Sequence, residues 1–261
     1  MTTRLDPPER SVLDRALGIL SVFDGSQRTL TLSEISRRSG LPVATVHRIT
    51  GKLLEWGALE RTDEGKYGIG LWLWKTGALA PRCSSLARAA HPYLVRLHQQ
   101  TGAAGVLAIR DGVQGLCLDA VFHHPQSPAA SSPGRRLPLH ATAAGLVLLA
   151  HAGQAVQDQV CAGPLERYTP STITEAVALR RCLTLVGRQG FAVAEGTHTV
   201  ASSGVAAPVR DERGSVVGAV AAVGWARDLQ PLKAVPAVLA AAEALTRQLQ
   251  ASGQQVVRAG A

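Results

Sequence analysis

The stretch from Ser36 to Gly70, SRRSGLPVATVHRITGKLLEWGALERTDEGKYGIG, decides the fold of the N-terminal part of the chain. It contains the turn signal Gly-Leu-Pro at residues 40–42, because glycine can end one helix in the left-handed conformation and proline suits the first turn of the next. Residues 43–56 then predict a helix, and residues 58–69 predict two short strands around a glycine-containing turn. The face of this helix that we expect to be buried comprises Val43, Val46, Ile49 and Leu53.

Two further helices are predicted before this stretch. Residues 12–23 place Leu13, Leu17 and Leu20 at helical spacing, which predicts a first helix with these side chains on its buried face. The second helix is expected to begin at a capping residue, Thr31 or Ser33, and to end at the glycine turn. Three helices followed by a hairpin predict a winged helix-turn-helix over residues 11–70.

The solvent-facing side of the third predicted helix has the composition of a DNA-reading surface. Small residues there let the backbone approach the major groove, and an arginine can bind guanine through two hydrogen bonds. An ordinary solvated helix face is the alternative interpretation. The DNA-contacting residues that we predict are Arg37, Ala44, Thr45, His47, Arg48 and Lys52 on the helices, with Arg61 and Lys66 on the hairpin touching phosphates or the minor groove.

Composition supports a folded protein and gives little help on partners. Hydrophobic residues make up 46% of the 261 residues, and the net charge is +8. Basic and acidic residues nearly cancel over residues 1–66, so the overall charge is weak evidence for nucleic-acid binding. No apolar run reaches the length of a membrane span, and no secretory leader is evident, so we expect a cytoplasmic protein without membrane contact.

Neither the cysteines nor the histidines predict a metal or a cofactor. The four cysteines lie far apart with no C-x-x-C pair, so a zinc site or a disulfide framework is not expected. His123 and His124 are adjacent, but neighbouring residues of an extended chain point to opposite sides, and no further ligand cluster lies nearby in the sequence.

Residues 71–84 are expected to form a linker helix. The segment LWLWKTGALA is rich in large apolar side chains, among them Trp72, Trp74 and Leu79. A helix leaving a small domain has little core in which to bury them, so we expect pairing with the linker of a second subunit in a homodimer. The alternative is that this helix covers the chain's own second domain. The helical pattern continues to about Thr101, with breaks expected near Pro81 and Pro92.

The remainder of the chain alternates hairpins with helices. Strands are expected at residues 105–110 and 115–121, and again on both sides of a turn at residues 211–214. Residues 139–152 predict a helix that is apolar on all sides and hence buried. A further helix is expected to open with the capping box Thr172-x-x-Glu175 and to end at Gly190, and a last helix to span residues 235–250. The pattern predicts an α+β domain with an antiparallel sheet flanked by helices.

Several motifs now resemble one family. The segments LTLSEISRRSGLPVATVHRITGKLLEWGALERTDEGKYGIG, GRRLPLHATAAGLVLLA, RQGFAVAEG and GVAAPVRDERGSVVGAVAAVG are similar to those of IclR-type bacterial transcription regulators. The resemblance implies a C-terminal GAF-like ligand-sensing domain, a dimer or tetramer that binds a double-stranded DNA operator, and no catalytic activity. It implies a DNA-binding domain at 11–70, a linker at 71–84, and an effector-binding and oligomerisation domain at 85–251.

The resemblance also implies where an effector would bind. Positions that often carry hydroxyls, thiols or carboxylates in the family are Ala, Gly or Val here, which favours an aromatic or alicyclic effector over a small, strongly charged acid. We expect one polar group of the effector to meet His140 or Glu195, and a neutral or phenolic compound to bind better than an anion. For His140 the alternative is a histidine that caps the buried helix. The expected lining is Leu137, His140, Thr142, Ala143, Glu195, Ser203, Gly204, Ala221 and Val223.

Two other functions remain open at this point. One is a small-molecule hydrolase or transferase on the α+β domain, although no nucleophile–base set or metal cluster is evident in the sequence. The other is a regulator whose sensor domain is vestigial and serves only for oligomerisation.

Overall fold

The computed structural model describes residues 11–23, 27–122 and 133–252. It divides into two compact units, residues 1–80 and 81–261. The boundary after Ala80 differs from the predicted one, because the predicted linker is two helices: one ends the first unit and the other, which starts at Pro81, belongs to the second. Over the residues that the structure describes, no helix is long and apolar enough to cross a membrane.

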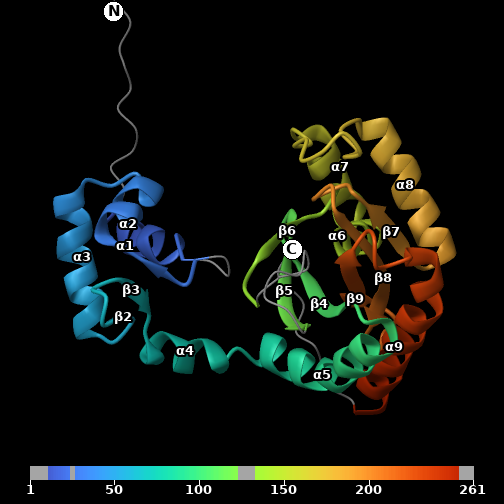
Figure 1. The fold of residues 1–261 in the computed structure, drawn as a ribbon, viewed down its shortest axis with the longest axis horizontal. Coiled ribbons are helices and arrows are strands. Elements are labelled where there is room, and N and C mark those ends of the chain that lie inside the picture. Colours follow the sequence, from blue (N-terminus) through green and yellow to red (C-terminus); the bar gives the residue numbers. More distant parts are fainter. Residues whose placement is uncertain (1–10, 24–26, 123–132, 253–261) are drawn as a thin grey trace, which may run out of the picture. The chain divides into compact units, whose positions relative to one another are not determined.

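The first unit is a winged helix-turn-helix, as predicted. Its three-stranded antiparallel sheet has the order β1-β3-β2, and its core lies between this sheet and the three helices. Gly40 ends α2 at φ +69°, which few residues other than glycine adopt. The elements, labelled in Figure 1, are α1 (Val12–Leu20), β1 (Thr29–Leu30), α2 (Leu32–Ser39), α3 (Val43–Glu55), β2 (Leu59–Arg61), β3 (Tyr67–Ile69) and α4 (Leu71–Ala78).

The buried side of α1 differs from the predicted one. Leu13 and Leu17 are 67% and 55% exposed, whereas Ile19 is fully buried and Ala16 and Leu20 pack beside it. Two apolar stripes overlap on this short helix, and periodicity alone does not decide which of them faces the core.

The buried stripe of α3 is also partly different. Val46 and Ile49 are buried as predicted, but Val43 is 49% exposed and Thr50 is buried. Thr50 can be buried because its hydroxyl donates to the Val46 carbonyl oxygen at 2.9 Å, so no polar group is left unsatisfied.

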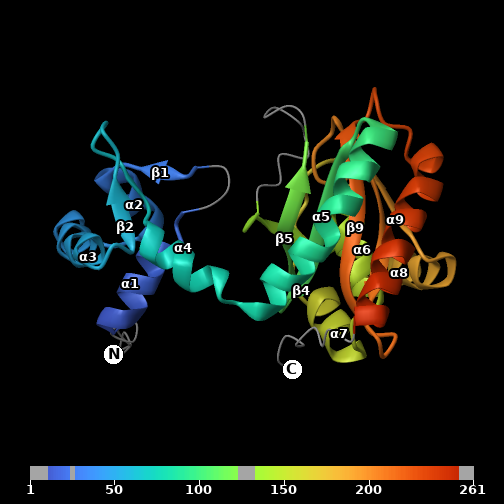
Figure 2. The ribbon, with the colours of Figure 1, turned by 90° about the horizontal axis from the view of Figure 1, so that it is seen from below.

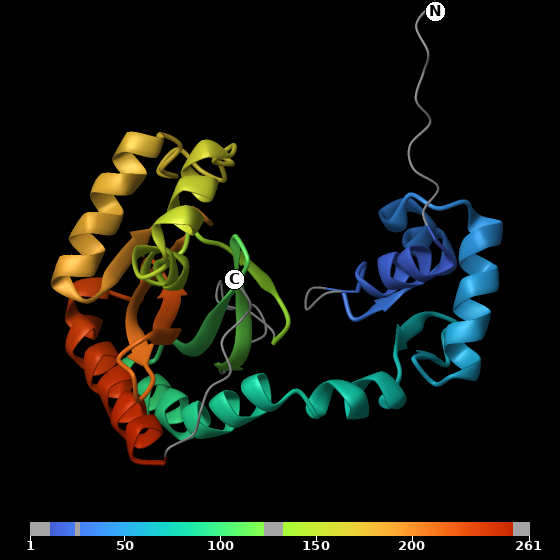
Figure 3. The same ribbon diagram turned by 180° about the vertical axis from the view of Figure 1, so that it is seen from behind.

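The second unit is a six-stranded antiparallel sheet with helices on both faces. The strand order is β6-β5-β4-β9-β8-β7. Helix α6 packs on one face with α8 behind it, and α5 and α9 cover the other (Figures 1 and 3). The elements are α5 (Pro81–Thr101), β4 (Ala104–Asp111), β5 (Gln114–Val121), β6 (Arg136–Pro138), α6 (Ala143–Ala150), α7 (Gln154–Ala162), α8 (Ala176–Gln189), β7 (Ala192–Glu195), β8 (Ser202–Arg210), β9 (Val216–Trp225) and α9 (Pro231–Ser252).

Helix α6 is buried on all sides, as its apolar sequence predicts, because it lies between the sheet and α8. Its first turn runs so close to the segment before it that a Cβ on Gly145 would lie 2.6 Å from the Pro138 carbonyl oxygen. Glycine is therefore required at this position.

Two predictions on helix boundaries are wrong. Helix α5 continues through Pro92, because a single proline removes one hydrogen bond while the helix stays packed on the sheet and on α9 (Figure 2). Helix α8 begins at Ala176, and Thr172 does not cap it. Thr172 instead lies in the loop before α8, where its buried hydroxyl accepts hydrogen bonds from the backbone N–H groups of Tyr168 and Thr169.

Candidate functional site

The outer face of α3 carries the predicted DNA-contacting side chains. Ala44, His47, Arg48 and Lys52 are exposed, and Thr45 is half-buried near the start of the helix. Arg37, on α2, is exposed as well. The face exists because the opposite side of α3 is held in the core by Val46 and Ile49, which leaves these positions facing solvent.

Two of these side chains are open to a new partner. Within residues 11–23, 27–122 and 133–252, neither the His47 ring nor the Arg48 guanidinium has a hydrogen bond or an ion pair. Lys52 pairs with Glu55 at 2.7 Å, but both side chains are more than 60% exposed, so this ion pair contributes little to stability. A DNA phosphate can therefore replace Glu55 as the partner of Lys52. The face can therefore donate hydrogen bonds to base edges and phosphates.

The wing is the hairpin formed by β2 and β3, and both of its predicted DNA-contacting cations, Arg61 and Lys66, contact other residues of the wing. The Arg61 guanidinium carbon lies 5.4 Å from the centre of the Tyr67 ring. Lys66 pairs with Glu64 at 2.7 Å, and this hydrogen bond lowers the pKa of Glu64 and raises the pKa of Lys66. Contact between Lys66 and a phosphate would therefore compete with an exposed intramolecular ion pair.

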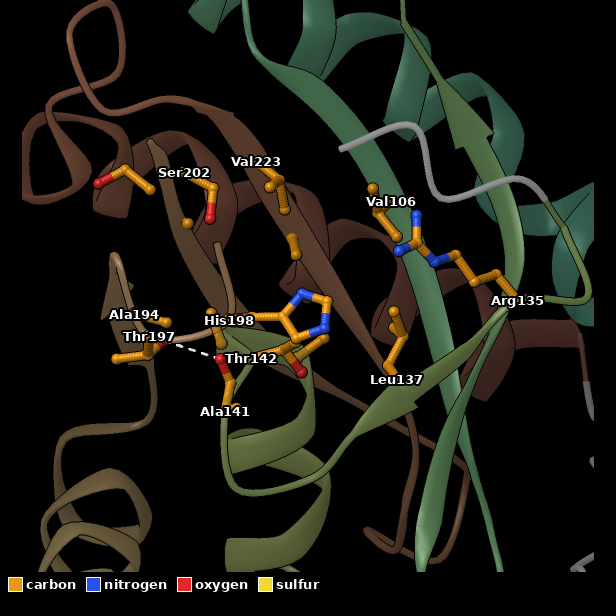
Figure 4. Close-up of a pocket in the computed structure, with 15 residues that line it drawn as sticks. Val106, Arg135, Leu137, Ala141, Thr142, Ala194, Thr197, His198, Ser202 and Val223 are labelled. Carbon is orange, nitrogen blue, oxygen red and sulfur yellow. Dashed lines mark hydrogen bonds between the residues drawn. The ribbon is translucent and has the colours of Figure 1, made fainter. Parts of the chain in front are cut away.

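A hollow in the second unit lies between the start of α6, the sheet and the loop that joins β7 to β8 (Figure 4). It holds about 610 Å³ of atom-free space, with its open mouth included. Its walls are small and mostly apolar, with a few hydroxyl and nitrogen-bearing side chains, which is the usual composition of a small-molecule site. The lining residues are Val106, Arg135, Leu137, Ala141, Thr142, Ala143, Ala144, Ala194, Thr197, His198, Ser202, Ser203, Gly204, Ala221 and Val223.

Most of the predicted effector-site residues line this hollow together. They come from β6, the start of α6, β8 and β9, which the antiparallel pairing of β8 with β9 and the packing of α6 bring to one place. Thr142 caps α6 by accepting a hydrogen bond from the Gly145 N–H at 3.1 Å. The predicted residues found in the lining are Leu137, Thr142, Ala143, Ser203, Gly204, Ala221 and Val223.

His140 and Glu195 also belong to the predicted effector site, but they are not among the residues that line this hollow. His140 is buried, and its Nε2 lies 2.9 Å from the Glu166 carbonyl oxygen, so it does not cap α6 either. Glu195 is exposed, because neighbouring residues of a strand point to opposite faces and Ala194 takes the side that faces the hollow.

The polar groups that sequence reasoning missed are Arg135, Thr197, His198 and Ser202. Arg135 directly precedes β6. Its backbone is fixed beside β5, because its carbonyl oxygen accepts a hydrogen bond from the Cys117 N–H at 2.9 Å. Because it lies two positions before Leu137 along an extended segment, both point into the hollow, and this alternation could have identified it. Thr197 and His198 lie in a loop with no periodic pattern that would have identified them.

The loop that carries His198 is fixed on two sides. Thr197 donates a hydrogen bond of 2.7 Å to the Ala141 carbonyl oxygen, the dashed line in Figure 4. Behind it, the Tyr168 ring packs edge-on against His198, with ring centres 4.8 Å apart. The Tyr168 hydroxyl donates to Glu166 at 2.8 Å, and burial and this carboxylate raise the pKa of Tyr168 to about 12.

The environment of His198 favours its neutral form. Burial lowers the pKa of the imidazole, and the positive charge of Arg135 lowers it further, whereas Glu166 acts in the opposite direction. Figure 4 shows the arginine side chain and the imidazole entering the same hollow from different segments. A neutral imidazole can both donate and accept a hydrogen bond, and Arg135 supplies a permanent positive charge beside it.

No group of three His, Cys, Asp or Glu side chains that could hold a metal ion is found in the described part of the chain. The His123-His124 pair lies outside the described residues. Burial raises the pKa of Cys117 to about 12, so this thiol is a core residue rather than a nucleophile.

Both units match one family of regulators. Residues 82–251 match the C-terminal domain of the bacterial transcriptional regulator IclR, and residues 12–63 match the IclR helix-turn-helix domain. The chain is 31% identical over 210 residues to the HTH-type transcriptional regulator XynR of Escherichia coli, a match that covers 80% of this chain and 83% of XynR. It is 33% identical over 214 residues to BhcR of Paracoccus denitrificans, covering 81% and 76%.

Solved structures agree with this match. An IclR homologue from Microbacterium hydrocarbonoxydans, in complex with 4-hydroxybenzoate, is 33% identical with a TM-score of 0.83 over 92% of this chain and all of that one. The Thermotoga maritima IclR is 26% identical with a TM-score of 0.71, covering 91% and 98%. The relatives are named as transcriptional regulators rather than enzymes, which sets the hydrolase or transferase alternative aside. The chain therefore belongs to the IclR family of DNA-binding bacterial transcription regulators.

Proposed function

We propose that occupancy of the hollow by a ring-shaped effector controls how the α3 face binds an operator in the cytoplasm. The observation that carries this proposal is that one chain of a regulator family holds both an outward-facing α3 surface and a separate hollow with small walls. An effector can change operator binding only if it binds the DNA-binding and the released states with different affinity. On this proposal, residues 11–70 bind DNA and residues 85–251 bind the effector.

On the DNA side, Arg48 hydrogen-bonds a base edge in the major groove, and small or short residues at the start of α3 let the helix enter the groove. Arg61 and Lys66 of the wing contact the sugar-phosphate backbone. The exposure of the α3 face and the open hydrogen-bonding capacity of His47 and Arg48 support this assignment. The proposed set is Arg37, Ala44, Thr45, His47, Arg48, Lys52, Arg61 and Lys66.

On the effector side, the composition of the hollow favours a ring. Ala143, Gly204 and Ala221 offer small apolar surfaces, and burying a ring against them contributes about 25 cal/mol per Å² removed from water. The relative that is solved with 4-hydroxybenzoate supports an aromatic ligand. The preference for a neutral compound rested on Glu195, which does not line the hollow, so that preference is withdrawn.

We also propose that the protein is at least a homodimer. Trp72, Trp74 and Leu79 are 45%, 66% and 79% exposed within the first unit, which is unusual for such large apolar side chains. Trp72 packs edge-on against Trp56, with ring centres 6.1 Å apart. A second subunit that covers this surface would bury it.

The test combines two measurements on the full chain. Thermal denaturation with a panel of aromatic and alicyclic compounds, and with small 2-oxo acids, identifies ligands because a compound that binds the native state raises the melting temperature. Fluorescence anisotropy with labelled operator DNA then shows whether the ligand changes DNA affinity. Rising melting temperatures with ring compounds, together with a changed operator affinity, are expected. If no ring compound raises the melting temperature, the hollow is not a sensor for such compounds, and the vestigial-sensor alternative is favoured.

A variant locates the ligand. A Cβ on Gly204 would lie at ordinary contact distance from its neighbours, 3.5 Å from the Val223 Cγ2 and 3.7 Å from the Ala143 Cβ. Gly204→Ala is therefore expected to keep the fold while its methyl group takes up part of the space that a ring needs. It should reduce the ligand-induced rise in melting temperature and leave operator binding intact. An unchanged ligand response in this variant would place the ligand elsewhere.

A further inference from the structure

A second pocket lies at one end of the six-stranded sheet, where β9 ends and the chain passes from α5 into β4. It holds about 810 Å³ of atom-free space, with its open mouth included, and we call it the Trp225 pocket. Val223 also lines the hollow described above, whereas the other described residues of the two linings differ. The lining of the Trp225 pocket includes His98, Thr101, Phe122, Trp225, Asp228 and Leu229.

The charges of the Trp225 pocket favour a cation. Asp228 is the one carboxylate among the described residues of its lining, which contain no lysine or arginine. Helix α5 ends in the lining at Thr101, and the last turn of a helix carries partial negative charge on its carbonyl groups. The Thr101 hydroxyl donates to the Leu97 carbonyl oxygen at 2.7 Å. The His98 Nδ1 donates to the Ala103 carbonyl oxygen, also at 2.7 Å, so neither proton is directed at a ligand.

The chain itself already places a cation against this wall. The Arg227 guanidinium carbon lies 5.6 Å from the centre of the Trp225 ring, and its Nε lies 3.4 Å from Asp228 Oδ2. An indole ring attracts a positive charge over its face, and a carboxylate attracts it directly. Arg227 is not among the residues that line the pocket, and its side chain is 79% exposed. Such an exposed ion pair is weak, so a ligand inside the pocket can take over the carboxylate.

The fold fixes the ring and the carboxylate relative to each other. Trp225 is the last residue of β9 and pairs with Ser202 of β8. After it the chain turns, and the backbone N–H groups of Asp228 and Leu229 donate to the Trp225 carbonyl oxygen at 2.9 and 2.8 Å. Phe122, which directly follows β5, supplies a second aromatic side chain. A site whose groups are already in place binds its ligand without first having to order them.

We propose that the Trp225 pocket is a second ligand site, which binds an organic cation: an ammonium compound with an apolar body. Asp228 pairs with the ammonium group beside the Trp225 ring, and the apolar body packs against Phe122 and Leu229. Arg227 acts as an internal competitor for the same carboxylate. The inference goes beyond the proposed function, because it assigns a different ligand class to a different site, and it does not depend on what the hollow binds.

The experiment is calorimetry on the full chain at pH 7.5 with two pairs of probes that differ in charge. They are 2-phenylethylamine with 2-phenylethanol, and cyclohexylmethylamine with cyclohexylmethanol; both amines are protonated at this pH. The wild-type protein should bind at least one amine ten or more times tighter than its alcohol. Asp228→Asn should bring the affinity for that amine to within threefold of that for the alcohol. Asp158→Asn is the matched control, because Asp158 also pairs with an arginine, Arg180, at 2.7 Å and does not line the pocket; it should behave like the wild type.

Arg227 gives a prediction of opposite sign. Arg227→Gln removes the internal competitor, so it should strengthen amine binding roughly two- to fivefold and leave alcohol binding unchanged. Trp225→Leu keeps an apolar side chain but removes the ring face, so it should weaken amine binding more than alcohol binding. Gly204→Ala alters the hollow and should leave amine binding as it is in the wild type, which would place the amine in the Trp225 pocket.

The outcomes separate this inference from the proposed function. If the amines bind no tighter than the alcohols, or if Asp228→Asn keeps the preference for the amine, the Trp225 pocket is not a cation site, whatever the hollow binds. Weaker amine binding in Arg227→Gln would also overturn the proposed arrangement, because Arg227 would then belong to the site. If amines bind as expected while no ring compound responds to changes in the hollow, the inference stands and the proposed effector site fails. Circular dichroism and operator binding show whether each variant is folded.

Discussion

The Thr172 hydroxyl donates a hydrogen bond of 2.6 Å to the Thr197 carbonyl oxygen, and thereby joins the loop before α8 to the loop that carries His198. The Thr172 hydroxyl oxygen in turn accepts hydrogen bonds from the N–H groups of Tyr168 and Thr169, at 3.1 and 2.8 Å. Thr172 is 5% exposed, so water cannot replace these partners easily. One buried hydroxyl thus organises the wall of the hollow behind His198.

Thr172→Val should therefore destabilise the protein. Valine has the same shape but leaves buried polar groups without partners, which costs about 1–3 kcal/mol. Thr184→Val is the matched control, because the Thr184 hydroxyl lies on the exposed side of α8 and donates only to the Arg180 carbonyl oxygen. Urea denaturation should show a clear loss for the first variant and a change within about 0.5 kcal/mol for the second. Equal stabilities would show that the Thr172 network contributes nothing to folding.

Arg48→Ala should weaken binding to the specific operator by about 1–3 kcal/mol and relax the preference for one base pair. The variant loses a bidentate hydrogen bond to a base edge. In the free protein the Arg48 guanidinium has no partner within the described residues, so it is available for this contact. Electrophoretic or anisotropy titrations with the operator, single-base variants and random-sequence DNA measure both effects. Unchanged affinity together with unchanged base preference would mean that another face of α3 meets the DNA.

Lys66→Ala should weaken binding to all DNA sequences about equally. A phosphate contact carries no base preference, and its loss lowers the slope of log affinity against log salt by about one. Glu64→Gln is the informative counterpart, because Glu64 holds Lys66 at 2.7 Å in the free protein and removing its charge releases the ammonium group. That variant should bind DNA more tightly at low salt. If neither change affects nonspecific binding, the wing does not touch the phosphates.

Local sequence patterns predicted most of the fold, because its helices and hairpins are short-range features. The glycine turn at Gly40, the helix end at Gly190 and the buried α6 were all readable from periodicity and turn chemistry. The capping box at Thr172 was wrong because the same residue types also close tight loops, and only the hydrogen bond from Thr172 to the loop between β7 and β8 reveals which role applies.

The hollow was harder to predict than the fold. Residues on regular elements, such as Thr142 and Ala221, could be placed from their strands and helices. Glu195 was misplaced because its neighbour Ala194 takes the inward position of the strand, so an error of one residue moved a carboxylate into the site. Arg135 alternates with Leu137 and could have been found from that spacing, whereas His198 comes from a loop without periodicity, and that both line one hollow is a long-range property of the fold.

The exposed apolar surface of α4 predicts self-association. Trp74→Glu should lower the affinity between subunits, because it places a charge where we expect a buried contact. Val177→Glu is the control, since Val177 is 64% exposed on α8 and lies outside this surface. Light scattering and sedimentation at micromolar concentration should show a dimer or larger for the wild type and the control, with a shift towards monomer for Trp74→Glu. A monomeric wild type would rule the proposal out.

A dimer also predicts the symmetry of the operator. Two identical DNA-binding domains related by a twofold axis bind an inverted repeat. Half-sites about 10 bp apart, or a multiple of this, place both domains on one face of the duplex. Footprinting of selected high-affinity DNA sequences measures this arrangement. Direct repeats, or a single half-site bound with full affinity, would contradict it.

His198 predicts how stability depends on pH. Its pKa in the folded state is lowered by burial and by Arg135, so below the ordinary value near 6.5 the unfolded chain binds this proton more readily than the native protein does. This residue therefore makes the native state less stable as the pH falls through the window between the ordinary and the lowered value, and has no effect above it. Urea denaturation at pH 7.5 and pH 5.5 should show a smaller loss at the acidic pH for His198→Asn than for the wild type.

The same shift has a direct readout in the wild-type protein. Histidine-selective NMR titration should place the pKa of His198 below the ordinary value, and Arg135→Gln should raise it, because the positive charge that adds to the effect of burial is gone. Arg136→Gln should leave it unchanged, since that side chain is paired with Asp111. If His198 titrates at its ordinary pKa in both the wild type and Arg135→Gln, the two side chains do not share the hollow in solution, and the pH dependence of stability must then come from other groups.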